Sequence, residues 1–202
     1  MSFSSGKKIN QPLKVVNLTF SVWETFLGNY FFGQTGLLTF GNRYNAWGAL
    51  INPPDSGVDM FWNVYTLSNF SSQPFTAEIW LNSTLPGRGA LSKDVASANQ
   101  AINPPPQPKV ELQYGDHVLK PPTKGIYSFA RIVEPNYTLT RHDFQGMIII
   151  PPGGSAITYL KSLMNGTIQS KIAFGWWEQE CKLSRELPGK ILSDKILRHE
   201  ID

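Results

Sequence analysis

A chain of 202 residues with a formal net charge of +3 is long enough for one large β domain or two small ones, and one domain is the simpler prediction. Its 41% hydrophobic and 12% aromatic residues supply a packed core and exclude a disordered chain. The mild positive charge is not gathered into the basic stripe that nucleic-acid binders carry, so no nucleic-acid partner is expected.

Cysteine content and the first residues bear on where the protein is made. Cys181 is the single cysteine, which excludes an intramolecular disulfide, a zinc ribbon and a redox pair. The first residues are followed by no apolar segment of the signal-peptide type, and no apolar run approaches the roughly 18 residues of a membrane span. We therefore expect synthesis in the cytoplasm without a signal peptide and no membrane insertion, with the spore or cell surface as a place of later deposition.

Three regions are expected along the chain. Residues 1–12 are predicted to form a flexible N-terminal arm, which can add a strand to the sheet of a neighbouring copy. Residues 13–182 are predicted to form a β-sandwich domain, and residues 183–202 a charged tail. The tail is expected to contain a short helix because of the spacing of Ile191, Leu192, Ile196 and Leu197.

Within the β domain, segments rich in β-branched and aromatic residues alternate with turns that contain Pro, Gly, Asn or Ser. The predicted strands are residues 13–20, 37–40, 46–51, 58–69, 75–82, 109–114, 125–133, 145–150, 155–163 and 167–177. The glycine-marked residues 28–36 are expected to form a loop. The fold class that these strands predict is all-β: an antiparallel β-sandwich of the jelly-roll or Greek-key type with a short C-terminal helix.

Two connections carry further predictions. Residues 58–69 and 75–82 are separated by a short polar turn, which predicts an antiparallel hairpin. The Pro-rich residues 86–108 suit a long crossover loop between strands. A linker between two smaller domains is the alternative interpretation of that segment.

Strand alternation predicts how two tryptophans are oriented, because neighbouring residues of a strand face opposite sides of the sheet. Ile172, Phe174 and Trp176 share one face, which is expected to be the core, so Trp177 is predicted to face outward. The same rule turns Trp80 outward. Cover by a loop or by the C-terminal tail is the alternative for both.

Low charge favours a contact surface as the role of these aromatic residues. Residues 20–90 contain only six charged residues, and the centres of protein interfaces are poor in charge and rich in aromatic groups. Trp80 and Trp177 are therefore candidate interface anchors in a homo-oligomer. Together with Tyr44, they are also candidates for stacking on carbohydrate rings. Strands buried on both faces explain the same pattern without any function.

Histidine spacing gives no support for a metal or for another cofactor. His117, His142 and His199 are scattered, with no spacing that brings two imidazoles to one ion. Asp116 precedes His117 and Asp143 follows His142, but adjacent residues of a strand diverge, which favours loop polar groups over a catalytic dyad.

Catalytic motifs are also absent from the sequence. It contains no nucleophile elbow, phosphate-binding loop or dinucleotide fingerprint. Paired carboxylates of a hydrolase are assembled in space rather than in sequence, so a hydrolase stays a further alternative. Glu78 and Glu111 are the acids that lie within predicted strands.

Four segments resemble an uncharacterised family of small proteins from spore-forming bacilli and clostridia: residues 48–54, 75–80, 148–155 and 173–178. The resemblance implies a bacterial origin and a β-rich domain, and it carries no catalytic residues. The chain is also loosely similar to the jelly-roll subunits of spore-surface fibres, although those use several cysteines and this chain has only Cys181. We therefore predict a non-enzymatic structural protein that self-associates through low-charge aromatic β faces. A carbohydrate-binding module is the first alternative.

Overall fold

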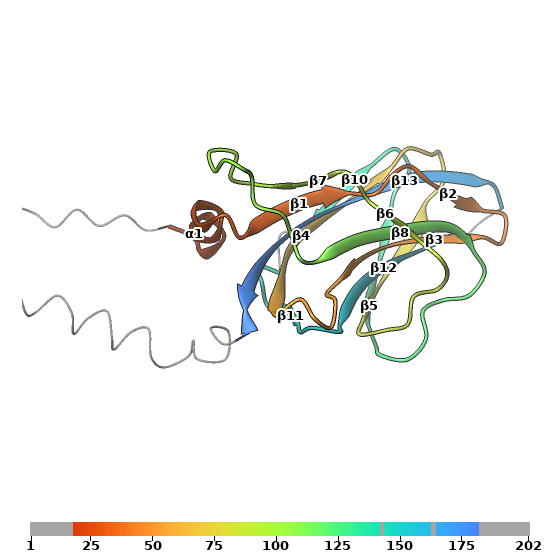
Figure 1. Cartoon of the computed structure of the whole chain (residues 1–202). Coiled ribbons are helices and arrows are strands. Elements are labelled where there is room, and N and C mark those ends of the chain that lie inside the picture. Colours follow the sequence, from red (N-terminus) through yellow and green to blue (C-terminus); the bar gives the residue numbers. More distant parts are fainter. Residues whose placement is uncertain (1–17, 142–143, 163–164, 182–202) are drawn as a thin grey trace, which may run out of the picture.

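The computed structural model describes residues 18–141, 144–162 and 165–181 as two antiparallel β-sheets packed face to face, with one short helix at one end (Figure 1). The predicted all-β antiparallel sandwich is thus confirmed. The expected N-terminal arm and C-terminal helix fall outside the described residues. Among the residues described, no helix is long and apolar enough to cross a membrane.

The first sheet has seven strands and the second has six. The seven-stranded sheet has the order β10-β4-β13-β1-β7, with β11 also paired to β4 and β2 to β13. Its strands are β1 (Tyr30–Gln34), β2 (Leu38–Gly41), β4 (Val58–Asn69), β7 (Val95–Ser97), β10 (Thr138–Arg141), β11 (Ile148–Ile150) and β13 (Thr167–Glu180). The six-stranded sheet has the order β6-β8-β3-β12-β5-β9. Its strands are β3 (Asn45–Ile51), β5 (Phe75–Leu81), β6 (Ala90–Leu91), β8 (Glu111–Val118), β9 (Ile126–Val133) and β12 (Ser155–Ser162).

The main core lies between the two sheets and is built by strand alternation. Along β13, Ile172, Phe174 and Trp176 all point into it, as predicted. A β-bulge in β4 keeps this pattern. Gly175 pairs with Val64 and Trp176 pairs with Trp62, so Asn63 has no residue opposite it in β13. The extra residue restores the inward orientation of both halves of β4.

A second apolar cluster lies on the outer face of the six-stranded sheet and contains Trp47, Ala49, Val118, Ile157 and Tyr159. The segment that includes Gly89 covers it, since a β-carbon at Gly89 would lie 2.5 Å from the Trp47 ring. This segment belongs to residues 86–108, the predicted crossover. It runs from β6 in one sheet to β7 in the other.

The predicted hairpin of residues 58–69 and 75–82 is wrong, because β4 and β5 lie in different sheets. The side-chain amide of Asn69 holds the connecting segment as a corner. It donates to the carbonyl oxygens of Gln73 at 2.8 Å and Glu134 at 3.0 Å, and its own oxygen accepts from the Ser71 amide at 3.0 Å. A polar turn that bends the chain between sheets has the same composition as one that closes a hairpin.

Only residues 18–20 of the predicted strand 13–20 are described, and they do not form a strand, because Phe20 begins the helix α1 (Phe20–Leu27). Thr19 precedes it in an extended conformation, and Gly28 ends it with φ 81°, where its amide and that of Asn29 cap the last carbonyls. Residues 30–34 of the predicted loop form β1, and sequence reasoning also missed β10 and the short strands β6 and β7 within residues 86–108.

Asn52 ties the two sheets together at the turn between β3 and β4. Its buried side-chain amide donates to the carbonyl oxygens of Val58 at 2.7 Å and Ile150 at 3.0 Å. These carbonyls belong to the seven-stranded sheet, whereas Asn52 follows β3 of the six-stranded sheet.

We expect Asn52→Ala to lower the free energy of unfolding by about 2–4 kcal/mol, because two buried carbonyl groups lose their donor. Asn45→Ala is the matched control, since Asn45 makes a single 3.4 Å bond to Val118, and it should cost less than about 1 kcal/mol. Urea unfolding followed by tryptophan fluorescence measures both. Equal losses in the two variants would contradict this role for Asn52.

Candidate functional site

Helix α1 presents its apolar side chains to solvent and its one charged side chain to the protein. Five apolar residues of the helix are 40–63% exposed, and we call their surface the α1 face: Phe20, Val22, Trp23, Phe26 and Leu27. Glu24 is only 2% exposed. A surface helix ordinarily has the opposite arrangement, with apolar residues inward and charge outward.

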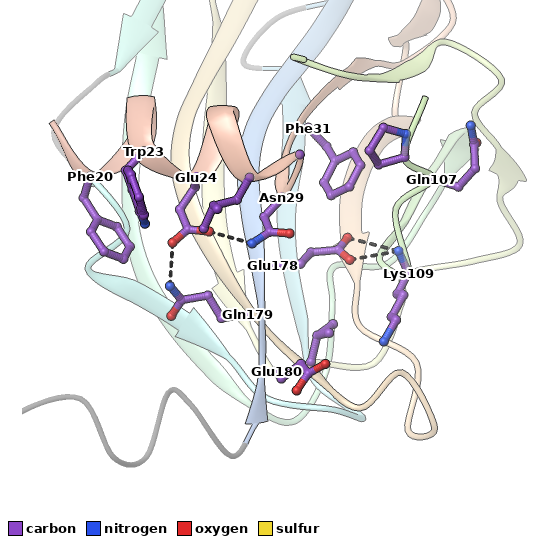
Figure 2. Close-up of a pocket in the computed structure, with 14 residues that line it drawn as sticks. Phe20, Trp23, Glu24, Asn29, Phe31, Gln107, Lys109, Glu178, Gln179 and Glu180 are labelled. Atoms are coloured by element: carbon purple, nitrogen blue, oxygen red, sulfur yellow. Dashed lines mark hydrogen bonds between the residues drawn. The ribbon is translucent and has the colours of Figure 1, made fainter. Parts of the chain in front are cut away.

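Hydrogen bonds to Glu24 explain this orientation. Its carboxylate accepts from the side-chain amide of Asn29 at 2.9 Å and from that of Gln179, on β13, at 2.8 Å (Figure 2). A buried carboxylate needs such donors, because burial without them is costly. The two contacts hold the polar side of α1 against the end of β13.

A groove of about 450 Å³ lies between α1, β13 and residues 106–109. Its apolar lining includes Phe20, Trp23 and Leu27 from the helix and Phe31 from β1. Figure 2 shows that the Glu178 carboxylate points away from α1, toward the opposite wall of the groove at Lys109.

The Glu178 carboxylate fastens that opposite wall to β13. Its oxygens accept from the backbone amides of Lys109, at 2.9 and 3.1 Å, and Val110, at 3.0 Å. The Trp176 indole N–H donates to it at 3.1 Å. Glu178 is 7% exposed, and these donors replace the water that it loses on burial.

Two of the three carboxylates that line the groove are therefore structural acceptors. Glu24 and Glu178 both bind protein donors, so neither is arranged as a general acid or base toward the groove. No group of three His, Cys, Asp or Glu side chains that could hold a metal occurs in the described part of the chain. What the groove and the α1 face offer is an apolar contact surface.

Trp177 lies outside the main core, as alternation predicts, but it is only 3% exposed, so the prediction of an exposed anchor is wrong. Its ring stacks on Phe61 at 5.4 Å with an interplanar angle of 7°, and the edge contact with Phe20 is 5.6 Å. The turn at Gly146 closes the remaining side, since a β-carbon there would overlap the indole ring. Trp177 thus helps to seat the start of α1.

Trp80 faces outward, as predicted, and is partly buried. Its indole N–H donates to Glu78 at 3.1 Å, and its ring meets Tyr127 edge to face at 5.1 Å. Tyr44 is 41% exposed, and its ring lies 5.4 Å from that of His117. Trp80 and Trp177 lie on the outer faces of different sheets, so the fold does not bring the predicted aromatic residues together in one platform.

Asp116 and His117 do touch, contrary to the prediction that they diverge. The His117 backbone adopts φ 57°, and its Nδ1 lies 3.0 Å from an Asp116 carboxylate oxygen. Asp116 also accepts from the Thr39 amide at 3.2 Å, and both side chains are partly exposed. The second pair, at residues 142–143, lies outside the described residues.

The remaining candidates do not converge. Glu78 on β5 and Glu111 on β8 are separated by β12 and β3. Three strand spacings of roughly 4.8 Å place these two strands about 14 Å apart, beyond the roughly 9.5 Å that paired glycosidase carboxylates span at most. Cys181 lies with its sulfur 3.8 Å from an Asp59 carboxylate oxygen.

Sequence reasoning missed the α1 face. The available signal was the segment at residues 20–27, whose apolar residues are interrupted by one acid and two small polar residues. The predicted strand 13–20 reached only Phe20, and residues 21–27 were assigned to no element, so the segment carried no expectation of an exposed helix.

Comparison with known proteins identifies a family without an assigned activity. Residues 3–183 match the model of a family described as "Family of unknown function (DUF6143)". Neither a curated protein nor a solved structure matches the chain.

We expect Glu178→Gln to lower the free energy of unfolding by about 2–4 kcal/mol, because an amide group replaces a charged acceptor of three N–H groups. Glu180→Gln, two residues along the same strand and exposed, should change it by less than about 0.5 kcal/mol. Chemical unfolding of both variants tests this. If the free energy of unfolding of Glu178→Gln equalled that of the wild type, these hydrogen bonds would not hold the groove wall in place.

Stability is expected to fall at alkaline pH because of Tyr159. Burial, and then the carboxylate of its cross-strand neighbour Glu78, raises the pKa of Tyr159 from 10.0 to about 12. The unfolded chain therefore loses this proton first, so the contribution of Tyr159 to stability is complete below pH 10 and is lost as the pH rises toward 12. Urea unfolding at a series of pH values should show a smaller alkaline loss in Tyr159→Phe. An identical loss in both proteins would contradict this assignment.

Proposed function

We propose that this chain, which belongs to the family of unknown function DUF6143, is a non-enzymatic structural protein that assembles with copies of itself through the α1 face. The spore or cell surface is the location that we propose for the assembly. The α1 face takes the role that sequence reasoning gave to the aromatic β faces.

The observation that carries the proposal is the reversed polarity of α1. Phe26 is 63% exposed and Trp23 is 45% exposed, whereas Glu24 on the same helix is 2% exposed. Contiguous apolar surface of this kind costs free energy in water and is typical of binding sites. Aromatic residues are also the side chains that most often dominate binding energy at protein interfaces.

A second copy is the occupant that fits the charge of this surface. Two identical surfaces that meet across a twofold axis bring like charges together when they carry any. The α1 face carries none, because Glu24 is turned inward and bound to Asn29 and Gln179. The groove beside each helix offers space for apolar side chains of the other copy.

Carbohydrate binding is the second candidate function, and the observation that favours it is the pair of Trp80 and Tyr127. Tyr127 is 50% exposed, and the Glu78 carboxylate beside Trp80 is a hydrogen-bond acceptor. The two rings are inclined at 62°, so the pair offers one open ring rather than a flat platform. Loss of glycan binding on Tyr127→Ala would support this candidate.

Phe26→Lys should break the contact made by the α1 face and lower the mass of the assembly. Phe26 lies in the last turn of α1, where a cation is compatible with the helix dipole. Loss of a central aromatic contact costs at least about 2 kcal/mol, which raises the dissociation constant at least about 30-fold. Size-exclusion chromatography with light scattering over a concentration series measures this change.

Leu119→Lys is the matched control, because Leu119 is 67% exposed and lies outside α1. It should leave the mass unchanged. Circular dichroism should show the same β content in both variants. If Phe26→Lys kept the wild-type mass at every concentration, the α1 face would not be the interface.

A further inference from the structure

The six-stranded sheet ends in an open edge strand, β9 (Ile126–Val133). One side of β9 pairs with β5, and no strand of the described residues pairs with the other side. An unpaired row of backbone N–H and C=O groups is a template for another strand.

The other terminal strands of the two sheets are short. β6 has two residues, β7 has three and β10 has four, whereas β9 has eight. Very short edge strands are one of the ways in which proteins prevent unwanted pairing. In the described part of the chain, β9 is the terminal strand without that protection.

The side chains of β9 are also suited to contact with another strand, because they are mostly uncharged and several apolar ones are exposed. Ile126, Tyr127 and Ile132 are 50–61% exposed, and Arg131 is the one charged residue of the strand. The Arg131 guanidinium lies 4.7 Å from the centre of the Phe129 ring and donates to the Ala130 carbonyl at 2.9 Å. It is therefore turned back onto its own strand.

We infer that β9 pairs antiparallel with β9 of a second copy, so that two six-stranded sheets become one continuous sheet. A twofold axis makes an antiparallel strand complementary to itself, because the donors of each copy face the acceptors of the other. The one charged side chain of β9, Arg131, contacts Phe129 and Ala130 of its own strand in each copy. The apolar side chains of β9 are therefore left to make the contact.

Two self-complementary surfaces on one chain have a consequence for the size of the assembly. The α1 face and the β9 edge each join one pair of copies, so together they link more than two copies, either in a closed ring or in an open chain. This consequence rests on the proposed function, whereas the pairing of β9 is a separate contact that can be tested without it.

The test uses the full chain with Ile126→Lys and Ile132→Lys combined, since lysine on an edge strand opposes pairing and both positions are exposed. Light scattering compares its mass with those of the wild type, Phe26→Lys and the combination of all three changes. We expect more than two copies in the wild-type assembly, two copies in each surface variant and one copy in the combination. Leu119→Lys again serves as the control, and unchanged circular dichroism shows that each variant is folded.

Hydrogen exchange provides a second measurement that does not depend on a variant. In concentrated wild-type protein, amides of residues 126–133 should exchange at least about tenfold more slowly than in dilute protein, because strand pairing protects them.

The outcomes separate the two surfaces. An unchanged mass in the β9 variant, or exchange at residues 126–133 that is independent of concentration, would overturn the inference and leave the α1 face to be judged by Phe26→Lys. A reduced mass in the β9 variant together with an unchanged mass in Phe26→Lys supports the inference and contradicts the α1 interface. Deletion of residues 1–12, the predicted N-terminal arm, tests the other occupant. If this truncation reduced the mass as the β9 variant does, the occupant would be the arm and the pairing of β9 with itself would be wrong.

Discussion

The alternation of side chains along β13 is the constraint on which the rest of the structure depends. Four consecutive residues at its end face alternate sides and each fasten a different part of the protein. Trp176 fills the core, and Trp177 seats the start of α1. Glu178 binds the amides of residues 109–110, and Gln179 binds the buried Glu24 of the helix. The position of α1, and with it the face that the helix exposes, follows from these contacts.

The sandwich was predictable from the sequence because the alternation of inward and outward side chains depends only on the order of neighbouring residues in a strand. The inward set Ile172, Phe174 and Trp176 needed no knowledge of partners. Partners themselves were not predictable: the turn after β4 has hairpin composition, yet Asn69 uses its side chain to bend the chain into the other sheet. Trp177 shows the same limit, since alternation gives its face but not the turn at Gly146 that covers it.

The candidate site was hidden for a related reason. The orientation of α1 is set by the bond between Glu24 and Gln179, which are 155 residues apart in the chain. A pattern within residues 20–27 cannot contain that information, and hydrophobic periodicity alone would bury the apolar side of such a helix. The expectation of a low-charge aromatic contact surface was made from the same stretch of sequence, but it was attached to β faces, where Trp177 is covered while Trp80 and Tyr44 stay partly exposed.

Exposed apolar residues differ from buried ones in what the fold requires of them. Phe26 and Ile132 are each at least 60% exposed, so a polar side chain at either position would leave the core and the pairing of β9 with β5 unchanged. Polar residues there would also reduce the free-energy cost of contact with water. Folding therefore does not require these positions to be apolar, whereas the proposed contacts with a second copy would. The helix offers side chains and the strand offers its backbone, and the two kinds of contact occupy separate parts of the surface.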